Sequence, residues 1–115
     1  MAARVLERLE NWVKLKPGEL KTLHFSDHAF VERVITDPIL KKPKKVVSLV
    51  FLVDEEDGRP VEKSFSVLSE RLMNELAPYL EGKRYRYYNF TFLKPEHPFA
   101  PPRLVSVTPR GPGVR

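Results

Sequence analysis

Cysteine is absent from this chain of 115 residues. Without thiols the protein cannot form a disulfide framework or hold zinc through thiolates. The sequence also lacks an apolar run of membrane-spanning length, and its first residues lack the apolar stretch of a signal peptide. These absences, with eleven prolines and a charged fraction of 30%, favour a cytoplasmic, heat-adapted protein without a membrane partner.

Signatures of common catalytic sites are missing too. The sequence contains neither a serine-nucleophile motif nor a glycine-rich phosphate loop. A zinc site needs three or four convergent ligands, whereas the histidines are scattered at His24, His28 and His97. The acidic run at residues 54–57 lacks the spacing of a calcium loop and is typical of a solvated hairpin tip. We therefore expect no enzyme, no cofactor and no metal ion.

The charge balance is basic. The net charge is +5 and the sequence pI is about 9.6, a value typical of nucleic-acid-binding domains. An ordinary excess of surface lysine would give the same balance. The charge is nevertheless concentrated, because four lysines surround one proline in a predicted loop: Lys41, Lys42, Lys44 and Lys45.

The order of the predicted elements indicates the fold class. Strand-like runs occupy residues 20–25, 46–54, 61–68, 85–93 and 104–108, and the first continues through 30–35 after a bend at 26–28. An amphipathic helix capped by Ser69 lies between the third and fourth runs and should end near Pro78. Asp57-Gly58 marks a hairpin turn. This order predicts a mainly β protein with a small five-stranded OB-like barrel.

The two ends of the chain differ from this central domain. Residues 3–13 have an apolar stripe that includes Leu9 and Trp12, which predicts an amphipathic helix. That helix could cover one end of the barrel or form a homodimer with a second copy. Residues 109–115 are basic and rich in glycine and proline, so we expect a flexible tail after a single domain at 1–108.

Aromatic and basic residues alternate at the start of the fourth predicted strand. Proteins that bind single strands combine cations for phosphates with rings on which bases stack, and such residues alternate here as Arg84, Tyr85, Arg86 and Tyr87. In an OB fold the binding groove lies on the face of strands two and three, and the predicted loops at 36–45 and 94–103 would flank it. Further candidate contacts are Lys63, Phe65, Phe99 and Arg103. Alternation of this kind is also common on ordinary edge strands, and Phe65 could equally belong to the core.

Several features follow one another between residues 15 and 108. They are the segment Leu15-Lys16-Pro17-Gly18-Glu19, the strand at 46–54, the Asp57-Gly58 turn, the run Lys63-Ser64-Phe65-Ser66-Val67 and the helix after it. In this combination the chain resembles small archaeal and viral OB-like single-stranded DNA-binding proteins. It is also similar to the thermophilic single-stranded DNA-binding proteins of crenarchaea, although it lacks their long C-terminal zipper helix.

The resemblance, the charge and the aromatic residues agree on one expectation. We expect a non-enzymatic protein that binds single-stranded DNA, or RNA, in a basic groove with aromatic stacking. The alternative is a protein-interaction subunit of a larger assembly, which would use the N-terminal helix and the proline-rich loop. A small metal-dependent nuclease is the third interpretation, for which the carboxylates near Asp54 are the nearest candidates.

Overall fold

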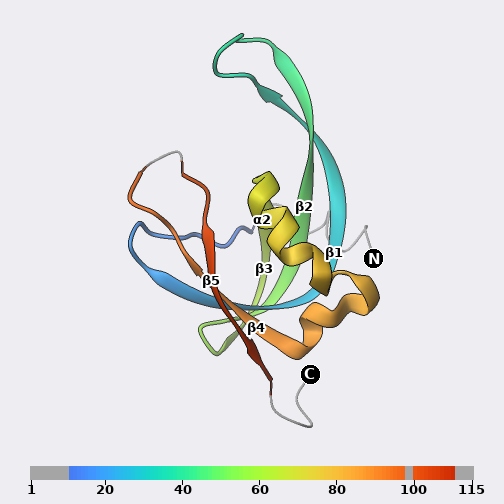
Figure 1. Cartoon of the computed structure of the whole chain (residues 1–115), viewed down its shortest axis with the longest axis vertical. Helices are drawn as coiled ribbons and strands as arrows, with labels where there is room; N and C mark the ends of the chain where they lie inside the picture. Colours follow the sequence, from blue (N-terminus) through green and yellow to red (C-terminus); the bar gives the residue numbers. More distant parts are fainter. Residues whose placement is uncertain (1–10, 98–99, 111–115) are drawn as a thin grey trace.

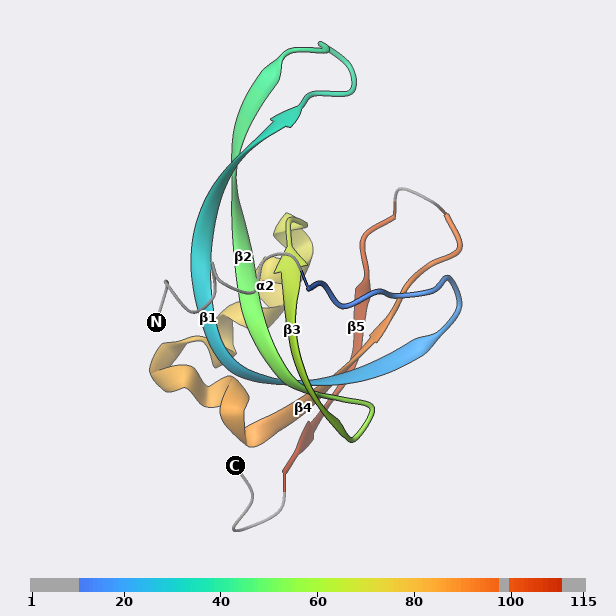
Figure 2. The same cartoon turned by 180° about the vertical axis from the view of Figure 1, so that it is seen from behind.

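Five antiparallel strands form a single sheet in the computed structural model, which describes residues 11–97 and 100–110 (Figures 1 and 2). Along the sheet the order is β3-β2-β1-β4-β5. The strands are β1 (Leu20–Thr36), β2 (Pro43–Glu56), β3 (Arg59–Val67), β4 (Tyr88–Leu93) and β5 (Arg103–Pro109). Helix α2 (Glu70–Leu76) and the 3-10 helices η1 (Ala77–Tyr79) and η2 (Glu81–Tyr87) connect β3 to β4. The mainly β class and the helix between the third and fourth strands are confirmed.

The sheet is not closed into the barrel that the sequence predicted. Strands β3 and β5 are its two edges, and no ladder joins them within the described residues. The sheet curls because β1 pairs with β4 only through Leu20–Leu23 and with β2 from Leu23 onward. Bulges at residues 24–27 bend β1 at this changeover. The predicted bend in the first strand is therefore confirmed at this position.

The segment at residues 11–18 connects edge strand β3 to the end of β4 through backbone hydrogen bonds. Val13 donates its backbone N–H to the carbonyl of Ser64 on β3 over 2.9 Å, and Gly18 donates to the carbonyl of Lys94 over 2.8 Å. Trp12 forms an isolated bridge with Ser64. Residues 11–13 are therefore extended, not the last turn of the predicted helix. The rest of that helix, residues 3–10, lies outside the described residues.

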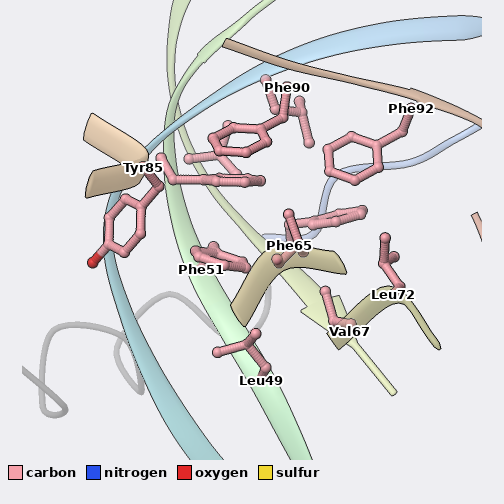
Figure 3. Packing of buried hydrophobic residues seen from close by; sticks show 12 residues of the cluster. Leu49, Phe51, Phe65, Val67, Leu72, Tyr85, Phe90 and Phe92 are labelled. Atoms are coloured by element: carbon pink, nitrogen blue, oxygen red, sulfur yellow. The ribbon is translucent and has the colours of Figure 1, made fainter. Parts of the chain in front are cut away.

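The concave face of the curled sheet holds a core rich in phenylalanine (Figure 3). The rings of Phe25 and Phe51 stack with centroids 4.0 Å apart, and those of Phe65 and Phe92 lie 4.9 Å apart. Helix α2 covers this face with Leu72 and Leu76, which are fully buried. The predicted cap is confirmed, because the Ser69 hydroxyl accepts from the N–H of Leu72 over 3.3 Å.

The fourth strand begins at Tyr88, three residues later than predicted. Gly82 and Lys83 both have left-handed backbone angles, with φ of 66° and 52°, and consecutive left-handed residues cannot continue a strand. The residues after them form η2, which carries Tyr85 into the core with no exposed surface. The alternation of tyrosine and arginine therefore belongs to a 3-10 helix.

Strands β1 and β2 continue beyond the core as a two-stranded arm, which we define as residues 30–36 and 43–47 with the turn between them. Figure 1 shows the arm projecting from the rest of the fold. It lengthens the molecule to 50 Å against 33 and 25 Å in the other directions.

At the C-terminal end of the described residues, Pro109 completes β5, and Arg110 donates its backbone N–H to the carbonyl of Tyr87 over 2.9 Å. Both had been assigned to the flexible tail.

Candidate nucleic-acid interface

The tip of the arm is a tight turn that displays the lysine cluster. The Asp37 carboxylate accepts from the backbone N–H groups of Ile39 and Leu40 over 2.8 and 2.9 Å. These two bonds hold the pKa of Asp37 below its usual value. The turn presents the four predicted lysines, all exposed, around its open end: Lys41, Lys42, Lys44 and Lys45. Four like charges on a narrow ribbon form a local positive field far from the core.

The flanks of the arm are apolar and uncovered. Phe30, Val34 and Val47 are 58%, 65% and 52% exposed. Phe30 pairs with Leu49 and Val34 pairs with Lys45 across the two strands, so these side chains share the face that becomes the core further along. Lys45 lies on the same face as Phe30, four residues further along the arm. Single-strand binders combine exposed rings with cations on one surface. Phe30 was not among the residues singled out from the sequence.

The 94–103 loop borders two neighbouring hollows of about 300 and 410 Å³. Both are lined by Ser69, Leu72 and the residues at 100–102. Arg103 belongs to the smaller hollow, while Arg33 of the arm and Lys94 belong to the larger. The larger hollow therefore lies between the 94–103 loop and Arg33 of the arm, and no residue of the 36–45 loop lines either hollow. Phe99 lies outside the described residues.

The outer face of β2 is not open to a ligand along its whole length. Val50 and Leu52 lie on this face and are 0% and 1% exposed, and Trp12 packs against them. The Arg33 guanidinium lies over the Trp12 ring, 4.8 Å from its centroid. The surface of strands two and three, predicted as the binding groove, is thus partly occupied by the chain itself.

Two predicted stacking residues are buried. Tyr85 has no exposed surface, and its hydroxyl is bonded to Nδ1 of His28 over 2.7 Å. Phe65 is 4% exposed and packs in the core against Phe25 and Phe92. Neither ring can meet a base in this conformation, so the expected exposure of Tyr85 was wrong, and Phe65 follows the alternative that placed it in the core. Both rings pack in the core, because burying a large aromatic ring removes a large apolar area from water.

Two further predicted contacts, Lys63 and Arg84, lie at or near the surface. Lys63 is paired with Glu56 over 2.8 Å, and Lys21 pairs with the same carboxylate over 3.0 Å. Burial alone would raise the pKa of Glu56, but hydrogen bonds from both lysines outweigh it and lower the pKa. Lys63 therefore belongs to an internal ion-pair network. Arg84 is exposed.

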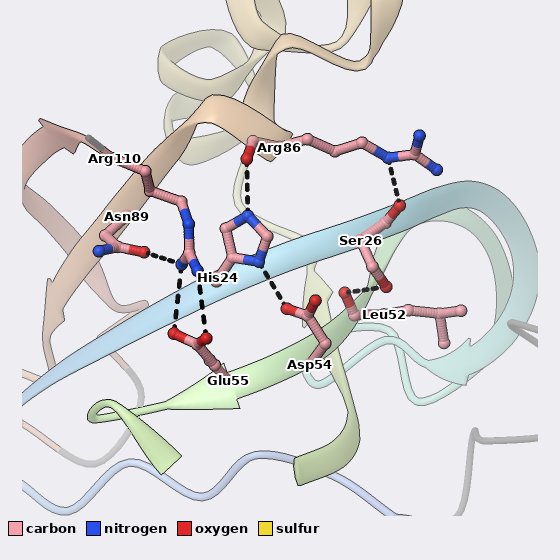
Figure 4. A network of polar contacts seen from close by, with 8 residues as sticks. All are labelled: His24, Ser26, Leu52, Asp54, Glu55, Arg86, Asn89 and Arg110. Atoms are coloured by element: carbon pink, nitrogen blue, oxygen red, sulfur yellow. Dashed lines mark hydrogen bonds and ion pairs between the residues drawn. The ribbon is translucent and has the colours of Figure 1, made fainter. Parts of the chain in front are cut away.

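Tyr87 and Arg86 line a separate hollow of about 290 Å³, which we name the bulge cleft, with His24, Ser26 and Asp54. The Arg86 Nε donates to the Ser26 carbonyl over 2.8 Å (Figure 4). Tyr87 is 60% exposed. His24, by contrast, is 2% exposed and bonds Asp54 and the Arg86 carbonyl through its two ring nitrogens. The cleft therefore combines an exposed ring, a guanidinium and a carboxylate.

Buried polar groups connect η2 to β1 beside this cleft. Asp27 is 2% exposed, accepts from the His28 N–H over 2.9 Å and pairs with Lys83 over 3.1 Å. Burial raises the pKa of Asp27, but these partners outweigh burial and hold the pKa below its usual value. Burial and Lys83 lower the pKa of His28, and burial raises that of the Tyr85 hydroxyl. We infer that a neutral His28 accepts the hydrogen bond from the Tyr85 hydroxyl.

Across residues 11–97 and 100–110, no three side chains of histidine, cysteine, aspartate or glutamate come together as a metal-binding group. No helix in the same part of the chain is long and apolar enough to cross a membrane.

Comparison of the chain with family models, curated protein sequences and solved structures gave no significant match. Any conclusion about function is therefore drawn from the residues and their geometry.

Proposed function

We propose that this chain binds single-stranded nucleic acid, with DNA favoured, and that the β1–β2 arm makes the main contact. The proposal rests on one observation: the arm projects from the core with four exposed lysines at its end and an exposed phenylalanine on its flank. Lysines can neutralise phosphates while the ring of Phe30 stacks with a base. No catalytic step is needed for this function.

The overall arrangement is consistent with the proposal. The β1–β2 and β4–β5 connections, which contain the arm tip and the 94–103 loop, correspond in chain order to the two loops that OB folds use for binding, and this supports the proposal. The hollow lined by Arg33 and Lys94 could continue the binding surface from the arm toward the loop. The sheet departs from a closed barrel, and an OB fold is itself only partly closed.

Fluorescence anisotropy with a labelled 20-nucleotide oligomer, single- or double-stranded, across a salt series tests the proposal. We expect preference for the single strand and a steep fall in affinity with salt. Equal and weak binding to both forms, lost at moderate salt, would mean that the positive charge is generic.

A matched pair of variants locates the stacking contact. Phe30→Ala should weaken single-strand binding by about 1–3 kcal/mol, the range for one stacked base. Val105→Ala on β5 removes a side chain of similar exposure, 52% against 58%, and should leave binding unchanged. Equal effects of the two substitutions would contradict a role for the Phe30 ring.

The exposed apolar surface favours a second candidate, a protein-interaction subunit. Ile39 and Leu40 at the arm tip are 86% and 66% exposed, and uncovered apolar surface often marks a protein contact. Light scattering of the purified chain distinguishes the two functions, since self-association lost on Ile39→Ser and Leu40→Ser substitution supports the second. The homodimer through the predicted N-terminal helix falls outside the described residues.

A further inference from the structure

The bulge cleft lies where both neighbouring strands are irregular. His24 pairs with Glu55 and Phe25 pairs with Val53, which leaves Asp54 as an extra residue in β2. The next irregularity leaves Ser26 as an extra residue in β1, because Phe25 pairs with Val53 and Asp27 pairs with Leu52. Bulges redirect side chains and are frequent beside functional sites. Here two of them place Ser26 and Asp54 in the same hollow.

The carboxylate in this cleft is held in position by a buried histidine. His24 Nε2 lies 2.7 Å from the Arg86 carbonyl oxygen. Its Nδ1 lies 2.6 Å from Oδ1 of Asp54, and this bond orients the carboxylate. The Asp54 side chain nevertheless remains 44% exposed, so it can still meet a ligand. Figure 4 shows these contacts from three separate segments of the chain.

Size and charge select the kind of ligand. A hollow of about 290 Å³ is at the lower end of the range for ligand pockets, about 300–1,000 Å³, and suits a single ring system. The exposed Tyr87 ring can stack on such a ligand. An amino group would donate a hydrogen bond to the Asp54 carboxylate, which a phosphate without a proton cannot do. Cytosine presents such a group, N4, and thymine presents a carbonyl at the same position.

We propose that the bulge cleft holds one nucleobase of the bound strand, stacked on Tyr87, and selects bases that present an amino group to Asp54. This inference rests on the proposed function. It adds a base preference to a contact that is otherwise independent of sequence. The arm and the cleft fit the same strand, because ten residues separate Ser26 from Thr36 and span at most about 33 Å.

The experiment compares two labelled oligomers, dC20 and dT20, by anisotropy at pH 7.5. Their pyrimidine rings are of similar size and differ at the position that would face Asp54. We expect the wild-type chain to bind dC20 about three- to tenfold more tightly, the effect of one hydrogen bond. Asp54→Asn should bring this ratio close to one, since an amide can donate to thymine as well as accept from cytosine. Glu81→Gln removes an exposed carboxylate outside the cleft and should preserve the ratio.

Substitutions of Tyr87 test the cleft and leave the hydrogen bond between His24 and Asp54 in place. Tyr87→Ala should weaken binding of dC20 by about five- to 100-fold and abolish the preference, because the base loses its stacking surface. Tyr87→Phe should retain both. Thermal unfolding of every variant shows whether loss of the Asp54 contact with His24 has altered the fold. If Asp54→Asn does not fold, the wild-type ratio and its loss in Tyr87→Ala decide the question.

Each result has a separate meaning. Equal, salt-dependent binding of dC20 and dT20 to the wild type would refute the nucleobase site and leave the proposed function standing. A dC20 preference that persists in both Asp54→Asn and Tyr87→Ala would place the selectivity elsewhere and likewise refute it. Absence of binding to either oligomer would overturn the proposed function and this inference together.

Discussion

The core half and the arm half of strands β1 and β2 differ sharply in the burial of their apolar side chains. Near the bend, Phe25 and Phe51 are at most 1% exposed and stack with their centroids 4.0 Å apart. Along the arm, Phe30 and Val47 lie on the same face of the same strands and are more than half exposed. Helix α2 and β4 cover the first half, whereas no described element covers the second (Figure 1). Apolar side chains in the arm therefore contribute little to folding, and we infer that they serve binding.

The difference in stability between two phenylalanines is the largest effect expected. Phe25→Ala should lower the free energy of unfolding by about 3–5 kcal/mol, because it leaves a cavity among stacked rings. Phe30→Ala should change it by no more than about 0.5 kcal/mol, as for other exposed positions. Urea unfolding followed by circular dichroism measures both. A large loss of stability in Phe30→Ala would show that the arm packs against another part of the protein.

Two tyrosines two residues apart provide a smaller contrast. Tyr85→Phe removes a buried hydroxyl that is bonded to His28 over 2.7 Å, and should cost about 0.5–1.5 kcal/mol of stability. Tyr87→Phe removes an exposed hydroxyl and should be neutral within about 0.5 kcal/mol. The same urea titration compares them. Equal effects would contradict the burial of Tyr85 in the core.

The free energy of unfolding should fall in mild acid because of His28. Because the pKa of His28 is lower in the folded protein than its usual value of 6.5, the unfolded chain binds more protons as the pH falls below that value. Stability from this group is therefore complete above pH 6.5 and is lost progressively as the pH falls toward the folded pKa. Unfolding midpoints at pH 7.5, 6 and 5 should decline, and His28→Gln should make the decline shallower.

The parts of the fold that were predicted correctly depended on local patterns. Alternation placed Phe90 and Phe92 in the core, where both are fully buried. The Asp57-Gly58 turn was correctly placed, and both residues adopt the left-handed backbone that such hairpins require. The continuation of the first strand through residues 30–35 was also predicted, and β1 ends one residue later, at Thr36.

The errors arose where tertiary contacts determine the structure. Tyr85 and Tyr87 look equivalent in an alternating sequence, but the left-handed turn at Gly82 and Lys83 turns one inward and leaves the other exposed. Trp12 was assigned to a helix, yet it is extended beside Ser64 of β3. The bulge cleft could not be recognised beforehand, because it needs the register of two strands and the path of η2.

Charge removal from the arm tests the central claim most directly. A triple variant with Lys41→Gln, Lys42→Gln and Lys44→Gln is compared with a control of equal charge, Lys14→Gln, Lys16→Gln and Arg59→Gln, at exposed positions outside the arm. We expect the arm variant to reduce the slope of log affinity against log salt by about 2 for single-stranded DNA, because each phosphate contact contributes about 0.7. The control should retain most of the slope. An equal loss of slope in both variants would contradict the assignment of the arm as the nucleic-acid contact.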